Sequence, residues 1–147
     1  MDWNLELLFV ARAIAAALLG ALVGLEREQH GREAGVRTYA AVSLGACVFG
    51  LVSSHVSAST DPTRIAAQVV TGVGFLGAGV ILREKGKITG LTTAATIWAT
   101  ASVGLAIAFG MYILGLLTTL IIFALLAVHH FPGWLRLGRK DKNAEHE

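Results

Sequence analysis

The sequence has little charge, few prolines and one cysteine. These shortages argue against a water-soluble domain, an intrachain disulfide and interrupted apolar runs. Only 15% of its 147 residues are charged, whereas soluble domains carry about 25%, so an ordinary water-soluble domain is disfavoured. Cys47 is alone and lies in an apolar run, so it cannot form an intrachain disulfide and is expected to be a core residue. The only prolines, Pro62 and Pro132, lie outside the apolar runs and therefore break none of them.

Patterns that would mark an enzyme are also missing. The chain has no Ser-His-Asp arrangement and no H-E-x-x-H spacing, and the pair His129 and His130 is expected at the membrane interface. We therefore expect no enzyme activity and no cofactor, while the sequence leaves open whether a metal ion is bound. The net charge of +2 does not indicate nucleic-acid binding, because the basic residues flank apolar runs as topology signals do.

Long apolar runs are what the sequence has in abundance. Apolar residues make up 54% of the chain, and the mean hydropathy is +0.65. No Asp, Glu, Lys or Arg occurs from Ile88 to Leu135. As one helix this stretch would be roughly 72 Å long, whereas the hydrocarbon core of a bilayer is about 30 Å thick. The stretch is therefore predicted to cross the membrane twice and to fold back near residues 109–112.

The runs predict an all-α fold, a polytopic transmembrane bundle with five spans. Each run approaches the length that a bilayer requires, and none shows strand-like alternation. The first run lacks a basic n-region and a cleavage site, which indicates a retained span rather than a signal peptide. Residues 1–130 are predicted to form the membrane domain and residues 131–147 a short basic cytoplasmic tail. The predicted spans are residues 5–25, 36–54, 65–82, 91–109 and 111–128.

The positions of Lys and Arg predict the orientation of the bundle. Three basic regions fall on one side only if the chain has five spans, and the opposite loop then has Arg64 alone. By the positive-inside rule the N-terminus is predicted to lie outside and the C-terminus in the cytoplasm. The three regions contain Arg27, Arg32 and Arg37; Arg83, Lys85 and Lys87; and Arg136, Arg139, Lys140 and Lys142.

Polar residues at the span ends form a candidate functional cluster. Ionisable groups at a membrane boundary usually need partners, so Glu26 and Arg37 are candidates for reaching into the bundle; a solvated, self-paired loop is the alternative. Asp61 is a candidate both for capping the third span and for contacting a cation, and Thr92 or Thr93 for capping the fourth span. The whole predicted cluster consists of Glu26, Arg27, Arg37, Thr38, Asp61, Arg64, Gln68, Thr92 and Thr93.

Glycines form two further patterns. Gly20 and Gly24 make a G-x-x-x-G, which lets another helix approach closely, either within the chain or in a dimer. Residues 72–77 match G-x-G-x-x-G, but a dinucleotide site is excluded because no strand precedes the motif and no acidic residue follows at the required distance. The glycines of the third span instead indicate either tight helix packing or an unwound segment whose backbone could bind an ion. They are Gly72, Gly74, Gly77 and Gly79.

Four segments, taken together in this order, resemble the MgtC/SapB family. They are GALVGLERE (20–28), GVRT (35–38), DPTRIAAQVVTGVGFLGAG (61–79) and GLTTAA (90–95). The resemblance covers about residues 5–128 and implies a multi-pass protein of the bacterial inner membrane. Many members carry a soluble domain after the last span, whereas here only residues 131–147 follow. Regulatory inputs attributed to that domain are therefore not carried over.

The resemblance also implies a function in magnesium homeostasis and stress adaptation, including the virulence-related survival of pathogens in macrophages. Members of this type are thought to modulate other membrane proteins rather than to carry magnesium. The leading expectation is therefore a regulatory or accessory protein. Its expected partners are the lipid bilayer, another membrane protein such as a transporter or the F-type ATP synthase, and a second copy in a homodimer or larger homo-oligomer. The alternative is a small transporter or channel for Mg²⁺ or another cation, acting as an oligomer.

Overall fold

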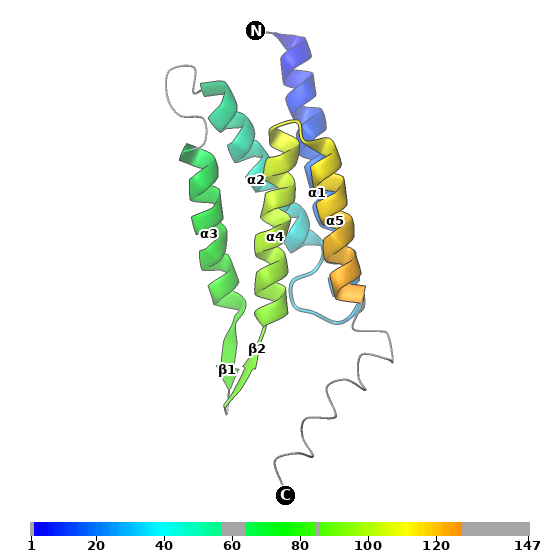
Figure 1. Cartoon of the computed structure of the whole chain (residues 1–147), viewed down its shortest axis with the longest axis vertical. Helices are drawn as coiled ribbons and strands as arrows, with labels where there is room; N and C mark the ends of the chain where they lie inside the picture. The colour runs from blue at the N-terminus through cyan, green and yellow to red at the C-terminus, as the bar shows by residue number, and fades with distance from the viewer. Residues whose placement is uncertain (1, 57–63, 85, 128–147) are drawn as a thin grey trace, which may run out of the picture.

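Five helices and one short β-hairpin make up the part of the chain that the computed structural model describes, which is residues 2–56, 64–84 and 86–127 (Figure 1). The predicted all-α bundle is confirmed, and the helix boundaries lie within a few residues of the predicted spans. The elements are α1 (Trp3–Gln29), α2 (Val36–Val56), α3 (Arg64–Val80), β1 (Leu82–Glu84), β2 (Lys87–Thr89), α4 (Leu91–Ala108) and α5 (Tyr112–Ala127).

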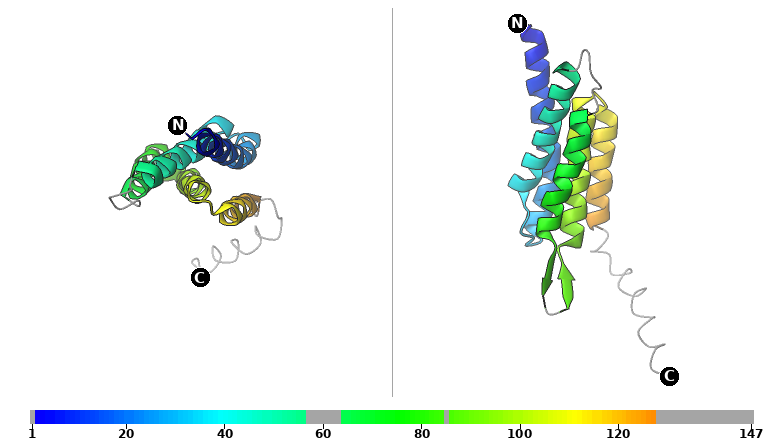
Figure 2. Two further views of the ribbon diagram at one scale, coloured as in Figure 1. Left: turned by 90° about the horizontal axis from the view of Figure 1, so that it is seen from above. Right: turned by 90° about the vertical axis from the view of Figure 1, so that its left-hand side faces the viewer.

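Helix α4 is the centre of the bundle and packs against each of the other helices (Figure 2). Ala, Gly and Thr make up much of α4, and such small residues let neighbouring helices approach on several sides. In contrast, α5 buries a single stripe at helical spacing, consisting of Gly115, Thr119, Ile122 and Leu126. The outer surfaces are apolar: the side chains of Leu7, Ile113 and Leu125 are 66%, 77% and 68% exposed. Apolar exposure on this scale is expected where lipid covers the protein.

Neighbouring helices approach each other most closely at glycine residues. A Cβ atom added to Gly20 would lie 2.5 Å from the carbonyl oxygen of Tyr39, and one added to Gly24 would lie 2.6 Å from the Cα atom of Val36. Gly104 of α4 meets the backbone of α2 at least as closely, at the carbonyl oxygen of Ser43. The G-x-x-x-G of α1 therefore packs against α2 of the same chain.

Helices α4 and α5 form a hairpin at the predicted turn. Gly110 adopts a φ of 76°, and Met111 N–H donates to the carbonyl oxygen of Ala106 at 2.8 Å, so the α4 carbonyls find partners as the chain reverses. Arg12 of α1 stabilises this turn with two hydrogen bonds. Its Nε donates to the Tyr112 hydroxyl at 2.8 Å, and its Nη1 donates to the carbonyl oxygen of Ala108 at 2.9 Å.

The β-hairpin was not predicted from the sequence. Strands β1 and β2 pair antiparallel in the register Leu82 with Thr89, and the turn between them contains Gly86 at a φ of 82°. The hairpin projects from the end of the bundle where α3 stops and α4 starts (Figure 1). The all-α class stands, because the two strands have only three residues each.

Within the described ranges, three helices are long and apolar enough to cross a membrane: α1, residues 36–55 of α2, and α4. Helices α3 and α5 are shorter apolar helices of 17 and 16 residues. The α1–α2 loop, the β-hairpin and the last turn of α5 lie at one end of the bundle, and Arg64 starts α3 at the other end (Figure 1). The basic residues of the first two predicted regions that the structure describes therefore share one end.

Candidate functional site: a buried polar cluster

A buried ion pair lies at the end of α1 that carries the basic loop. Arg27 Nε donates to Glu26 Oε2 at 2.6 Å, and the two residues are only 6% and 5% exposed. A charged side chain at such a site requires a partner, and each of these residues supplies it to the other. Glu26 Oε1 accepts no hydrogen bond in the described residues, and His30 Nδ1 lies 3.2 Å from it.

The end of α1 holds this pair in place. Gly31 adopts a φ of 63° just past the helix, and its N–H donates to the carbonyl oxygen of Glu28 at 3.0 Å. The Arg32 N–H reaches back to the carbonyl oxygen of Arg27 at 3.0 Å, which completes a Schellman motif. His30 Nδ1 also lies 2.6 Å from the backbone oxygen of Glu26. The chain therefore leaves α1 along a fixed path directly beside the ion pair.

Glu28 performs a different task from its neighbour Glu26. Its Oε2 accepts a hydrogen bond from the backbone N–H of Val36 at 3.0 Å, at the start of α2. The first backbone N–H groups of a helix lack intrahelical partners, so this carboxylate caps α2 from α1. A Cβ atom at Gly35 would lie 2.6 Å from Glu28 Oε2, and this close approach favours glycine there. The predicted self-pairing of the loop is replaced by this cap.

Tyr39 extends the cluster across the bundle to α4. Its side chain is fully buried, and its hydroxyl lies 2.6 Å from Thr96 Oγ1 and 3.5 Å from the carbonyl oxygen of Thr93. Thr96 Oγ1 in turn lies within hydrogen-bond distance of α4 carbonyl oxygens one turn earlier. The phenol is close enough to Glu26 and Arg27 to interact with them electrostatically. We call Glu26, Arg27, Tyr39 and Thr93, together with the half-buried Thr96 and the exposed His30 at the edge, the buried polar cluster.

The structure brings only part of the predicted cluster together. Glu26, Arg27 and Thr93 belong to the buried polar cluster, whereas Arg37 is exposed on the first turn of α2. Asp61 lies outside the described residues. Of the others, Thr38, Arg64, Gln68 and Thr92 are all exposed, and Thr38 and Gln68 line a separate groove between α2 and α3.

The residue that caps α4 differs from the one predicted. Helix α4 starts at Leu91, and its N-cap is Gly90, which has a φ of 85° and makes no side-chain capping bond. Thr92 and Thr93 therefore lie inside the helix, and neither is the cap. Gly90 is required here because a Cβ atom would collide with the carbonyl oxygen of Val80 at the end of α3.

The glycines of α3 neither unwind the helix nor all pack tightly. Helix α3 is continuous from Arg64 to Val80. A Cβ atom added to Gly77 would lie 3.5 Å from the carbonyl oxygen of Ala94, an ordinary contact, whereas Cβ atoms added to Gly72, Gly74 and Gly79 would meet nothing within 4 Å. The unwound alternative is therefore wrong for this structure, and the close packing predicted for these three is not seen within one chain.

Sequence reasoning missed Tyr39, Thr96 and His30. Tyr39 could have been predicted as a site residue, because it lies in an apolar run and a buried phenol usually has a hydrogen-bond partner. No sequence spacing joins Tyr39 to Thr96, because they lie on different helices. In the described residues, no group of three or more His, Cys, Asp or Glu side chains is arranged to hold a metal ion. Chemically, the charges within the cluster neutralise each other, and its contacts hold the ends of α1, α2 and α4 together.

Among the described residues, the only buried charged side chains, Glu26 and Arg27, pair with each other, and the outer helix faces are apolar; these features define a membrane protein. Comparison with known proteins gives the family. The chain belongs to the MgtC family, whose model matches residues 13–131. No solved structure matches the chain.

Curated relatives agree with this assignment. The chain is 48% identical over 114 residues to the protein MgtC of Salmonella typhimurium LT2, an alignment that covers 78% of this chain and 49% of that protein. It is 45% identical over 129 residues to the protein MgtC of Brucella abortus, covering 87% and 54%. It is 45% identical over 130 residues to YhiD of Escherichia coli K12, whose name gives magnesium transport as a candidate activity, covering 83% and 60%. The chain thus spans about half to three fifths of these relatives.

Proposed function

We propose that this protein regulates or assists other membrane proteins during magnesium homeostasis and stress adaptation, and that it does not itself carry the ion. We further propose that it is a multi-pass protein of the bacterial inner membrane with five spans and an external N-terminus. Its partner would be a larger membrane protein such as a transporter or the ATP synthase, contacted through helices.

One observation favours a regulator over a cation transporter: the buried Glu26 carboxylate is already paired with Arg27. A cation pathway needs acidic or carbonyl oxygens that face water and remain free for the ion. Here the buried carboxylate is neutralised by an adjacent guanidinium at 2.6 Å from its Oε2, and its other oxygen, Oε1, is buried away from water. The other polar candidates do not continue a path from it, because Arg37 is exposed at the bundle end and Gln68 faces a groove between α2 and α3.

Two measurements on the same 147-residue chain test this proposal. Purified protein in liposomes is expected to show no Mg²⁺ flux above empty liposomes. The same gene, expressed in a bacterium that lacks its own MgtC-family gene, is expected to restore growth in low magnesium. Mg²⁺ flux that is lost in Glu26→Gln or Gln68→Ala would overturn the regulatory proposal. Failure to restore growth would remove the link to magnesium.

The proposed topology has its own test. In a Cys47→Ser background, a cysteine placed at Trp3 is expected to react with a membrane-impermeant maleimide in intact spheroplasts. A cysteine placed at Lys87 is expected to react only after the membrane is permeabilised. Labelling of both in intact spheroplasts, or of Lys87→Cys alone, would contradict an external N-terminus with five spans.

The alternative is a small cation transporter, and one observation favours it. At the end of the bundle away from the basic loop, a cleft of 520 Å³ between α1 and α2 is lined by Asp2, Glu6 and His55 among apolar residues. Carboxylates at a cleft mouth would attract cations. If flux is observed and is lost in Glu6→Gln rather than in Glu26→Gln, the transporter alternative replaces the regulatory one.

A further inference from the structure

Arg12 is a charged residue whose hydrogen-bond partners are all uncharged. It lies on α1, at the level of the α4–α5 turn, and is half-buried. Its acceptors are the Tyr112 hydroxyl and the carbonyl oxygen of Ala108, and the described part of the chain gives it no ion pair. Ionisable groups within a membrane usually pair with an opposite charge, as Glu26 and Arg27 do at the other end of α1. Arg12 therefore lacks a counter-ion.

No acidic side chain of the described helices is placed to supply this counter-ion. Helices α2 to α5 contain no Asp or Glu. The acid of α1 nearest in sequence is Glu6, which lies roughly 9 Å from Arg12 along the axis and about 120° around it. Glu6 lines the cleft between α1 and α2 instead. Residues 57–63, which include Asp61, join α2 to α3, and α3 lies on the far side of α4 from α5 (Figure 2). The counter-ion is therefore expected to come from outside the chain.

Hydrogen-bond donors remain free at the same place. Only two N–H groups of the Arg12 guanidinium have acceptors in the described residues, which leaves the others free. Its Nη2 lies beside Gly110, where an added Cβ atom would meet only that nitrogen, at 3.6 Å, so no side chain covers it there. Because the Tyr112 hydroxyl accepts from Arg12 Nε, its own proton is left to donate, and no described residue accepts it. Two adjacent side chains thus offer free donors to an anion with several oxygens.

The surroundings of these donors are apolar. Helix α1 continues from Arg12 back to Trp3, roughly 14 Å, and projects past the α4–α5 turn (Figure 1). On this projecting part, Leu7 and Val10 are 66% and 55% exposed, and Ile113 at the start of α5 is 77% exposed. Apolar exposure on this scale is expected where acyl chains cover the protein. An anion that carries acyl chains therefore fits the site better than a free inorganic anion.

Helix length also brings lipid headgroups toward the turn. Helices α4 and α5 have 18 and 16 residues, or roughly 27 and 24 Å, whereas the hydrocarbon core of a bilayer is about 30 Å thick. A bilayer adapts to short helices by thinning beside them. The phosphate groups of the leaflet at the N-terminal end of α1 are thereby drawn toward the level of Arg12.

We propose that Arg12 and Tyr112 bind the phosphate group of an anionic phospholipid in the leaflet at the N-terminal end of α1. The guanidinium and the phenol donate hydrogen bonds to the phosphate oxygens, and the acyl chains lie along the exposed face of α5. A lipid with one net negative charge neutralises Arg12, whereas a zwitterionic lipid brings an ammonium group for which the described site has no carboxylate. The proposal does not rest on the regulatory function, because its test measures lipid binding and not magnesium-dependent growth.

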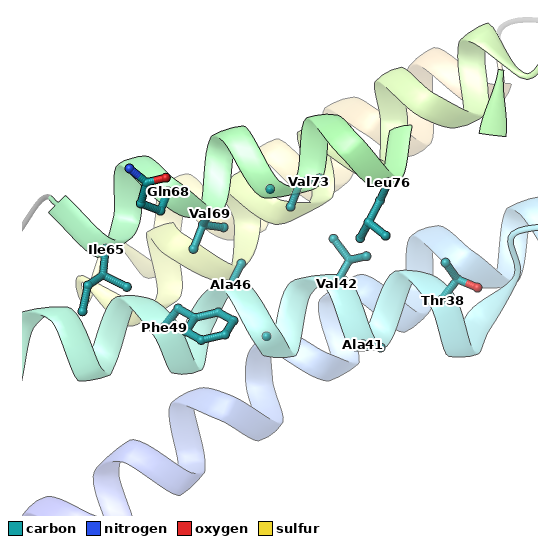
Figure 3. A pocket seen from close by; sticks show the side chains of 12 residues that line it. Thr38, Ala41, Val42, Ala46, Phe49, Ile65, Gln68, Val69, Val73 and Leu76 are labelled. Atoms are coloured by element: carbon teal, nitrogen blue, oxygen red, sulfur yellow. The ribbon is translucent and has the colours of Figure 1, made fainter. Parts of the chain in front are cut away.

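A different place for a lipid is the groove of 550 Å³ between α2 and α3 (Figure 3). The residues that line this groove include no charged side chain. A lipid in the groove would be held by its acyl chains, without preference for a charged headgroup. Headgroup preference therefore distinguishes the proposed site from the groove.

The test is the dissociation constant of single lipids from the detergent-purified 147-residue chain, measured by native mass spectrometry. Phosphatidylglycerol is expected to bind at least about 10-fold more tightly than diacylglycerol with the same acyl chains, as one charge-assisted hydrogen bond provides. Arg12→Gln should abolish this preference and leave diacylglycerol binding unchanged, whereas Tyr112→Phe should weaken phosphatidylglycerol binding about 3-fold. Arg64→Gln is the matched control, because Arg64 is an exposed arginine at the same end of the bundle. It should alter binding by less than about 2-fold.

Three results of this titration would overturn the proposal. One is equal binding of phosphatidylglycerol and diacylglycerol by the unmodified chain. Another is a preference that both Arg12→Gln and Tyr112→Phe leave intact; if Arg12→Gln lacks the helical circular dichroism of the parent, Tyr112→Phe decides alone. The third is displacement of phosphatidylglycerol by an excess of glycerol phosphate, which would assign the site to a free phosphate instead of a lipid.

Photolabelling locates the lipid independently. A phosphatidylglycerol whose acyl chain carries a diazirine next to the glycerol is expected to label residues 109–114 of the unmodified chain, and less so in Arg12→Gln. Label confined to the groove between α2 and α3 would also overturn the proposal.

Discussion

Replacing Glu26 by Leu and Arg27 by Met, singly and together, tests whether the buried pair is a matched unit. Each residue is at most 6% exposed, so each single substitution leaves the remaining charge buried without its partner. Removing one member of a buried ion pair costs about 3–5 kcal/mol, whereas replacing both by apolar residues of similar volume is often neutral. The double variant should therefore be more stable than either single variant, with a coupling free energy of about 3 kcal/mol or more.

The assay is unfolding of the purified chain in mixed micelles by added SDS, followed by far-UV circular dichroism. Arg32→Met is the matched control, because Arg32 lies just past the end of α1 but is exposed. It should change the free energy of unfolding by no more than about 0.5 kcal/mol. If Arg27→Met is no more destabilising than this control, the pair does not stabilise the fold. If the double variant loses the sum of the two single losses, the charges are not coupled.

Three further tests, one of them with a matched control variant, address the contacts between helices. Gly104→Ala should destabilise the fold by about 1–3 kcal/mol through overpacking against the α2 backbone, whereas Gly74→Ala, in open space, should be no less stable than the parent in the same SDS titration. Tyr39→Phe removes one buried hydrogen bond and should cost about 1 kcal/mol; no loss would mean that the phenol does not join α2 to α4. Tyr112→Phe deprives Arg12 of a partner and should speed amide hydrogen exchange in the first turn of α5, and unchanged exchange would contradict the fastening of that turn.

Much of the fold could be predicted because a bilayer restricts the structures that a spanning segment can adopt. A bilayer fixes the length of a span, and backbone groups in it must pair within a helix, so runs of apolar residues predicted five helices and their approximate ends. The turn at Gly110 was predictable because the uncharged stretch was too long for one crossing. The β-hairpin escaped prediction because its strands have only three residues each, too few to show a period.

The candidate site was less predictable, because its contacts join different helices. The boundary position of Glu26 indicated a partner, but not that this partner is the adjacent Arg27. Helical neighbours in sequence point about 100° apart, and only the bundle decides which of them is buried. The glycines of α3 predicted either tight helix packing or an unwound segment, and the sequence cannot distinguish these from a continuous helix whose glycines face open space.

Arg12 and Tyr112 are separated by 100 positions in the chain and joined by one hydrogen bond. The ribosome releases α1 first, so the guanidinium enters the bilayer long before its partners exist. Arg12 lies level with the α4–α5 turn, so its cost in the bilayer is below the roughly 2.5–3.5 kcal/mol that insertion scales give for an arginine at the centre of a spanning helix. That cost is relieved only when α4 and α5 arrive. Chains that stop before α5 would thus retain an unsatisfied cation in the membrane, a feature by which a membrane protease could distinguish unfinished copies from finished ones.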